Sequence, residues 1–124
     1  MRLLLDTNAF IWWVANDPKL RATARAEIAR AESVAVSAAS AWEIAIKKGI
    51  GKLRAPDDLE AELDRNGFAP LPVTFAHARV SETLPWHHRD PFDRMLVAQA
   101  QVEGLTLVTR DRRLALYGVA TLGV

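Results

Sequence analysis

The chain has 124 residues, of which 50% are hydrophobic and none is cysteine. That length suits one domain covering residues 1–124 around one buried core, and the lack of cysteine excludes disulfides and thiolate metal sites. The formal net charge of +1 at pH 7 does not mark a nucleic-acid binder. No apolar run approaches the roughly 18 residues that span a bilayer, and three leucines after Arg2 are too few for a signal peptide. We therefore expect a cytoplasmic protein without a membrane partner.

Strand-like and helix-like segments alternate along the whole chain. Short apolar runs predict strands at 2–5, 33–37, 69–73, 106–109 and 119–122. The stretches between them predict helices at 7–15, 18–31, 39–50, 56–66, 74–84, 90–103 and 111–116. This alternation is typical of the α/β class, and it predicts a three-layer α/β/α domain with a mostly parallel central sheet of about five short strands.

Proline positions refine two of these segments. Asp17-Pro18 places a capping residue before a proline, which favours a helix that starts at Pro18. Pro70 and Pro72 lie in the third predicted strand, and a proline cannot donate a hydrogen bond to a neighbouring strand. We therefore expect this strand at an edge of the sheet or in an irregular segment.

Four acidic residues lie where ligands commonly bind in such a sheet. Asp6 directly follows the first predicted strand, and Asp111 closely follows the fourth. Glu43 and Asp93 lie early in two predicted helices. In an open parallel sheet, ligands bind just beyond the carboxyl ends of the strands. Carboxylates gathered there would repel one another unless a cation lay between them, and a hard divalent metal with phosphodiester chemistry suits that arrangement.

Asp6 and Asp111 also have a purely structural interpretation. Each stands where a helix is predicted to begin, and aspartate is favoured as an N-cap because its carboxylate accepts a backbone N–H. Asn8 would hydrogen-bond either a ligand or only the turn. Thr109 carries a hydroxyl that could orient a carboxylate or a metal-bound water. The residues alone leave these alternatives open.

Glu43 lies in the helix predicted at 39–50. Trp42 and Ile46 are expected to face the core at their four-residue spacing, which places Glu43 beside a buried stripe. The alternative is an exposed ion pair between Glu43 and Lys47, which would contribute about 0.3–0.5 kcal/mol.

The helix predicted at 90–103 has a strong start signal. Asp90 is the expected N-cap and Asp93 the third helical residue, which resembles a capping box with aspartate in place of glutamate or glutamine. The positive end of the helix keeps Asp93 ionised and ready for a cation. We assign Asp90 mainly to capping and Asp93 mainly to the site. His88 is interpreted as a solvated loop residue, with a substrate contact as the alternative.

Basic and aromatic residues around these acids offer further contacts. Four basic residues are candidates for binding a nucleic acid: Lys47, Arg89, Arg94 and Arg110. For each of them an ordinary solvated charge is the alternative. The tryptophans at 12, 13, 42 and 86 could stack on bases, although core or interface packing is the simpler interpretation. The three histidines form no zinc-ligand pattern.

Four segments spread over the chain form a set. They are Leu-Leu-Leu-Asp-Thr-Asn at 3–8, Ser-Ala-Trp-Glu-Ile-Ala-Ile-Lys-Lys-Gly-Ile-Gly-Lys-Leu at 40–53, His-Arg-Asp-Pro-Phe-Asp-Arg-Met-Leu-Val-Ala-Gln-Ala at 88–100, and Leu-Val-Thr-Arg-Asp at 107–111. Together they resemble the PIN-domain ribonucleases, and in particular the VapC-type toxins of bacterial toxin–antitoxin modules.

The resemblance implies an endoribonuclease that depends on Mg²⁺ or Mn²⁺. Carried over position by position, its acidic quartet is Asp6, Glu43, Asp93 and Asp111, accompanied by Asn8, Thr109 and Asp90 as supporting residues. Asp6 and Asp93 are the first choices for direct metal ligands, while Glu43 and Asp111 ligate directly or through water. The resemblance also implies an antitoxin partner near the acidic groove and a homodimer. It does not identify the RNA that is cut.

Other classes of protein fit the sequence less well. A phosphatase of the haloacid dehalogenase class needs a second aspartate two residues after the first, and that position is Asn8. A response-regulator receiver needs adjacent acids before its first helix, which the chain lacks. A non-catalytic PIN-like module that binds RNA or a partner stays as the alternative, although the intact acidic set argues against it.

Overall fold

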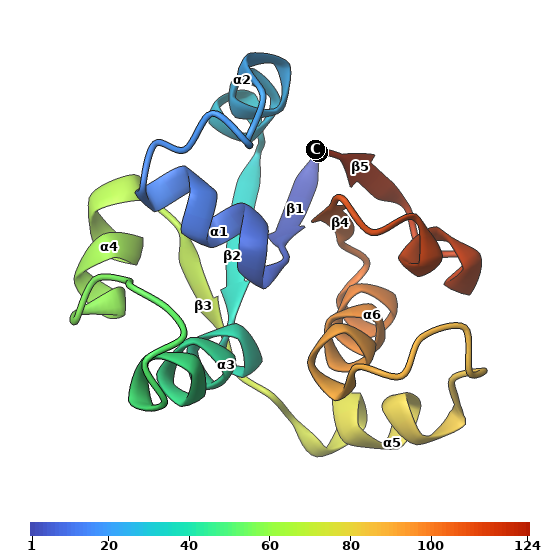
Figure 1. The fold of residues 1–124 in the computed structure, drawn as a ribbon. Coiled ribbons are helices and arrows are strands. Elements are labelled where there is room, and N and C mark those ends of the chain that lie inside the picture. Colours follow the sequence, from blue (N-terminus) through green and yellow to red (C-terminus); the bar gives the residue numbers. More distant parts are fainter.

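A five-stranded sheet forms the centre of the fold in the computed structural model, which describes residues 1–124. The strands are β1 (Arg2–Leu5), β2 (Ser33–Ser37), β3 (Ala69–Leu71), β4 (Thr106–Thr109) and β5 (Thr121–Gly123). The helices are α1 (Thr7–Val14), α2 (Ala22–Arg30), α3 (Ala38–Gly49), α4 (Leu59–Asn66), α5 (Phe75–Thr83), α6 (Pro91–Glu103) and the 3₁₀ helix η1 (Arg112–Tyr117). Figure 1 shows the helices arranged around the sheet.

The strand order is β3-β2-β1-β4-β5, and all four neighbouring pairs are parallel. After β1 the chain proceeds to β2 and β3 on one side, and then crosses to β4 and β5 on the other. The order therefore reverses between β1 and β4. In sheets of this kind the crevice beyond such a reversal is the usual ligand site. The predicted α/β class with a parallel central sheet is confirmed.

The core lies on both faces of the sheet because side chains alternate along each strand. On β1, Leu3 and Leu5 pack with Phe10 and the first four helices, whereas Leu4 packs with Leu96 on the α6 side. All three leucines of β1 are fully buried. Each contributes about 1.5–3 kcal/mol through burial, so the strand that carries Asp6 is held firmly from both sides.

Local signals explain most of the boundaries, with one correction at Asp17. Asp17 does not cap a helix: its carboxylate accepts the Lys19 backbone N–H within a turn, and α2 begins four residues after Pro18. Aspartate and proline are also favoured in tight turns, and residues 17–19 form a turn instead of the first turn of a helix. The strand containing Pro70 is β3, which lies at an edge of the sheet as predicted.

The expectation that Trp42 and Ile46 face the core is wrong. Trp42 is 65% exposed and Ile46 is 41% exposed, whereas Ile44 is 1% exposed and Glu43 only 7%. The buried face of α3 is therefore the one that carries Glu43 and Ile44. A four-residue apolar spacing marks one face of a helix, but it does not say whether that face meets the core or a partner.

The helices are also too short or too polar to cross a membrane.

Candidate active site

The carboxyl ends of β1 and β4 open into a cavity of about 310 Å³. Five carboxylates line it together with two basic residues and three other side chains: Asp6, Glu43, Asp90, Asp93, Asp111, Lys47, Arg110, Thr7, Asn8 and Trp12. A water molecule occupies about 30 Å³ of liquid, so the cavity has room for a hydrated cation beside a phosphate group. The structure thus brings all four predicted acids to one place.

Asp6 stands at the junction of β1 and α1. Its carboxylate caps α1 by accepting the Ala9 backbone N–H at 2.8 Å. The helix-capping role expected for Asp6 is therefore observed, and the same carboxylate also lines the cavity. The residue is 7% exposed. Burial raises the pKa of Asp6, and the charges of Glu43 and Asp111 raise it further, against the lowering effect of the Ala9 hydrogen bond. A cation beside Asp6 would relieve that cost.

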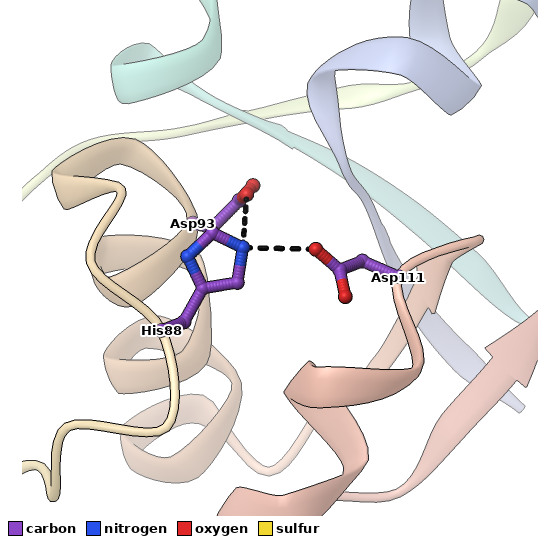
Figure 2. A group of neighbouring side chains, drawn as sticks. All are labelled: His88, Asp93 and Asp111. Carbon is purple, nitrogen blue, oxygen red and sulfur yellow. Dashed lines mark hydrogen bonds and ion pairs between the residues drawn. The ribbon is translucent and has the colours of Figure 1, made fainter.

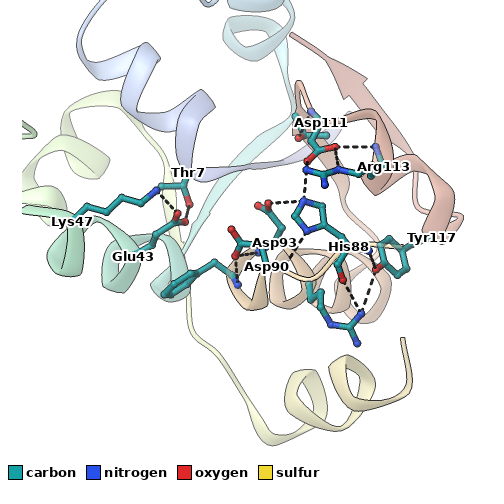
Figure 3. A network of polar contacts seen from close by, with 12 residues as sticks. Thr7, Glu43, Lys47, His88, Asp90, Asp93, Asp111, Arg113 and Tyr117 are labelled. Atoms are coloured by element: carbon teal, nitrogen blue, oxygen red, sulfur yellow. Dashed lines mark hydrogen bonds and ion pairs between the residues drawn. The ribbon is translucent and has the colours of Figure 1, made fainter. Parts of the chain in front are cut away.

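Glu43 reaches the cavity from the second turn of α3. One carboxylate oxygen accepts the Thr7 hydroxyl at 2.7 Å, and the other accepts Lys47 Nζ at 2.8 Å (Figure 3). The predicted ion pair with Lys47 is confirmed, yet Glu43 is buried rather than exposed. Thr7 holds Glu43 toward the acids at the end of β1, a role that the sequence did not suggest.

Asp90 and Asp93 enter the cavity from the start of α6. The Asp90 carboxylate caps the helix by accepting the backbone N–H groups of Phe92 at 2.8 Å and Asp93 at 3.4 Å, as predicted. The pKa of Asp93 rises to about 7, first because the carboxyl is desolvated and then because Asp90, Asp6 and Glu43 are negative nearby. His88 opposes the rise. The expectation that the helix end keeps Asp93 ionised is therefore wrong for the metal-free protein, because desolvation and the neighbouring acids favour the protonated carboxyl up to a pH of about 7.

Asp111 follows β4 and has several hydrogen-bond donors. Its carboxylate caps η1 through the Arg113 backbone N–H, and the Arg113 guanidinium donates to both of its oxygens at 3.0 and 2.7 Å. These bonds to Arg113 hold the pKa of Asp111 well below its usual range. The Thr109 hydroxyl accepts the Asp111 backbone N–H at 3.0 Å, so Thr109 shapes the turn that presents this acid.

His88 is the residue that the sequence interpretation missed. It is 7% exposed rather than solvated. Its Nε2 lies 2.8 Å from Asp111 Oδ2 and 3.3 Å from Asp93 Oδ2 (Figure 2). Its position two residues before the α6 cap was visible in the sequence, but only the folded chain shows that the ring lies between two of the predicted site acids.

The hydrogen bonds of His88 decide what its ring can do. Nδ1 accepts the Asp90 backbone N–H at 3.0 Å, so in the neutral ring the proton sits on Nε2. Nε2 is then a donor to Asp93 and Asp111 and has no lone pair for a metal. These three side chains are close enough to hold an ion, but the hydrogen-bond pattern makes His88 an orienting donor and leaves ligation to the carboxylates.

Three of the four candidate RNA contacts are accessible to a ligand, and the fourth is buried. Lys47 and Arg110 line the cavity, and Arg89 is exposed in the loop before α6. Arg94 is corrected: it is 6% exposed, and its guanidinium donates to the backbone carbonyls of Pro85, Ser81, Leu84 and His88. Arg94 therefore fixes the loop that carries His88 instead of facing a ligand. Asn8 is exposed and lines the cavity.

The carboxylates form an oxygen donor set that suits a hard divalent cation, because Mg²⁺ binds through a few carboxylates and keeps several waters. Desolvation and the neighbouring negative charges raise the pKa values of Asp6 and Asp93, so ionising these carboxyls is unfavourable without a nearby positive charge. Strong perturbation of this kind is common at functional sites. The geometry is that of a candidate acidic metal site at the switch point of a parallel sheet.

Fold and site together define the class of protein. Residues 3–120 match the PIN domain, and the chain belongs to the PIN-domain family. It is 34% identical over 119 residues to ribonuclease VapC22 of Mycobacterium tuberculosis, a match that covers 90% of this chain and 88% of the relative. The resemblance to VapC-type proteins is thereby confirmed.

Several solved structures share this fold, among them two VapBC complexes. The DNA-bound VapBC of Salmonella typhimurium aligns with a TM-score of 0.70 and 21% identity, covering 99% of this chain and 98% of the other. VapBC2 of Rickettsia felis, bound to a DNA fragment from its promoter, aligns with a TM-score of 0.73 and 16% identity over 99% and 98% of the two chains. At these identities the likeness concerns the fold.

Proposed function

We propose that this protein is a Mg²⁺-dependent endoribonuclease that acts as the toxin of a toxin–antitoxin module. The observation that carries the proposal is the crowding of five carboxylates in one cavity at the end of β1 and β4. Desolvation, followed by the charges of Asp90, Asp6 and Glu43, raises the pKa of Asp93 to about 7. The 34% identity to ribonuclease VapC22 supports RNA as the substrate.

Asp6 and Asp93 would hold the metal directly, because both are desolvated and both gain from a positive charge. Glu43 and Asp111 would complete the set directly or through water, and Mn²⁺ would fit the same oxygen donors. When bound, the metal lowers the pKa of water and offsets the charge that develops on the attacked phosphate.

The protein's own residues orient these carboxylates. Thr7 and Lys47 hold the two oxygens of Glu43, while His88 and Arg113 hold Asp111. Such hydrogen bonds fix the direction of a ligand and are part of what gives a metal site its affinity. Lys47 and Arg110 supply positive charge at the rim, where a phosphodiester would otherwise meet only acids.

Two apolar surfaces are suited to protein partners. One is a groove of about 590 Å³ between α3, α5 and α6, lined in part by Trp42, Val73, Phe92 and Met95, which supports a homodimer. The other is a smaller groove beside α1 and α4, lined in part by Phe10 and Leu59. Residues of α1 and α3 line both this groove and the acidic cavity, so an antitoxin that follows these helices could insert an arginine or lysine among the carboxylates.

The decisive experiment incubates purified, antitoxin-free protein with total cellular RNA and Mg²⁺. We expect discrete fragments that are absent with EDTA and absent for Asp6→Asn. Asp64→Asn is the matched control, because Asp64 is an exposed aspartate on α4 outside the cavity, and this variant should cleave as the wild type does.

The result that would overturn the nuclease assignment is a folded wild type that binds Mg²⁺ weakly or not at all and leaves RNA intact. RNA binding without metal, unchanged in Asp6→Asn, would instead support the non-catalytic binding module. Cleavage that survives both EDTA and Asp6→Asn would assign the activity to a contaminating ribonuclease.

A further inference from the structure

A second cavity of about 650 Å³ adjoins the acidic one. Its lining comes from the start of α2, the end of β4, η1 and β5: Arg21, Thr109, Arg110, Asp111, Arg112, Ala115, Thr121, Gly123 and Val124. Arg110 and Asp111 line both cavities, so the two cavities are neighbours. We call this second cavity the arginine groove. Its charged side chains are three arginines and one aspartate, the reverse of the balance in the acidic cavity.

Arg110 is held in place where the two cavities meet. Its guanidinium lies over the Trp12 ring with Cζ 4.4 Å from the ring centroid. Nε donates to the backbone oxygen of Val124, the last residue of the sequence, at 3.2 Å, and one terminal nitrogen donates to the Lys19 carbonyl. An arginine held by stacking and backbone bonds loses less conformational entropy when an anion arrives. No aspartate or glutamate side chain is among these partners.

Arg21 and Arg112 supply the other two charges of the arginine groove. Both side chains are exposed, and neither has a hydrogen bond or ion pair within the protein. Some exposed arginines are paired, such as Arg30 with Glu27 and Arg65 with Glu62, whereas the unpaired Arg2 and Arg79 lie outside both cavities. Unpaired guanidiniums that converge on one concave surface form a ready site for phosphate, which arginine recognises through its planar fork of donors.

We propose that the arginine groove binds phosphate groups of the RNA strand on one side of the bond that is cut. This inference rests on the proposed nuclease function and extends it to the path of the substrate. A strand whose scissile phosphate lies in the acidic cavity passes Arg110 and continues between Arg21 and Arg112. The lining also contains Ala115, Thr121 and Gly123, whose side chains are too small to reach far along a base edge. The groove therefore positions the backbone and does not read sequence.

The test measures binding of a short fluorescein-labelled single-stranded RNA of mixed sequence by fluorescence anisotropy over a series of salt concentrations. The Arg21→Ala/Arg112→Ala variant is compared with Arg2→Ala/Arg79→Ala, all in an Asp6→Asn background with EDTA so that the RNA stays intact. Arg2 and Arg79 are exposed, are unpaired and lie outside both cavities. The control pair thus removes the same charge from elsewhere on the surface.

Each lost phosphate contact lowers the steepness of log K against log salt by about 0.7 for a single strand. We expect a decrease of about 1.4 for the groove variant and roughly tenfold weaker binding at physiological salt, with little change for the control. Arg21→Lys/Arg112→Lys should recover most of the affinity. Groove and control variants with the same affinity and salt dependence would overturn the proposal.

Two further outcomes separate the groove from other hypotheses. If the native protein fails to cleave RNA while the groove variant still shows weakened RNA binding, the nuclease function fails and the groove stands. If the groove variant loses affinity for labelled polyglutamate but keeps its affinity for RNA, the groove binds an acidic protein segment and the proposal is overturned.

Discussion

Replacing Asp93 by asparagine should stabilise the metal-free protein at neutral and alkaline pH. Asp93 is the acid whose pKa rises to about 7, mainly through desolvation and then through the charges of Asp90, Asp6 and Glu43. Asparagine keeps the shape of the protonated acid and removes the charge. A charged residue that serves a metal site should lower the free energy of unfolding when the metal is absent.

The size of the effect follows from the two pKa values. The rise from 3.8 to about 7 is about three pH units, and each unit corresponds to roughly 1.36 kcal/mol, so the upper limit is about 4 kcal/mol. The Asp93 side chain is still 24% exposed, and solvent screening reduces the figure. We expect a gain of about 2 kcal/mol in the free energy of unfolding at a pH of about 8.

The pH dependence has a definite sign. The folded-state pKa lies above the unfolded value, so the stability associated with Asp93 is fully present below a pH of about 4 and is lost as the pH rises through about 7. The advantage of Asp93→Asn over the wild type should therefore be close to zero below a pH of about 4. It should grow between these two values and level off above them.

The assay is urea unfolding in EDTA, followed by circular dichroism at several pH values. Asp64→Asn is the matched control, because Asp64 is exposed on α4 and its removal should give no pH-dependent gain. The electrostatic reasoning would be refuted if Asp93→Asn lowered stability at a pH of about 8, or if its effect were the same at a pH of about 4 and about 8.

Three further predictions concern other parts of the molecule. His88→Ala should weaken Mn²⁺ binding in calorimetry roughly tenfold, whereas the exposed His87→Ala should leave it unchanged; equal affinities would refute an orienting role for His88. Trp42→Glu should shift the proposed dimer toward monomer in light scattering, and a dimer that persists would place the interface elsewhere. Gly104, at φ 67°, ends α6, so Gly104→Ala should cost about 1 kcal/mol in urea unfolding, a loss absent from Gly49→Ala.

Most of the fold could be predicted because its signals are local. Apolar runs marked every strand within a few residues, and Asp90 before Pro91 marked the start of α6, where the cap is observed. Pro70 placed its strand at the edge. These signals succeed because caps, turns and strand burial depend on neighbours in sequence. The turn at Asp17 shows the limit, since the same residue pair is favoured in two local structures.

The acids of the candidate site were also visible early, for a topological reason. Asp6 and Asp111 follow neighbouring parallel strands, and the carboxyl ends of such strands share one edge of the sheet. Glu43 and Asp93 needed the resemblance to a family as well, because a position inside a helix does not say which face is buried. Trp42, expected in the core and found 65% exposed, shows how that choice can fail.

The sequence by itself determined the α/β class, the order of the elements and the acids that gather beyond β1 and β4. Only the tertiary structure decided the surroundings of those acids: His88 between Asp93 and Asp111, Arg94 buried under the loop before α6, and unpaired arginines converging on one groove. Hydrogen bonding and burial between segments far apart in the chain depend on packing geometry. No local pattern of residues encodes that geometry, and it sets both the pKa of Asp93 and the direction of each carboxylate.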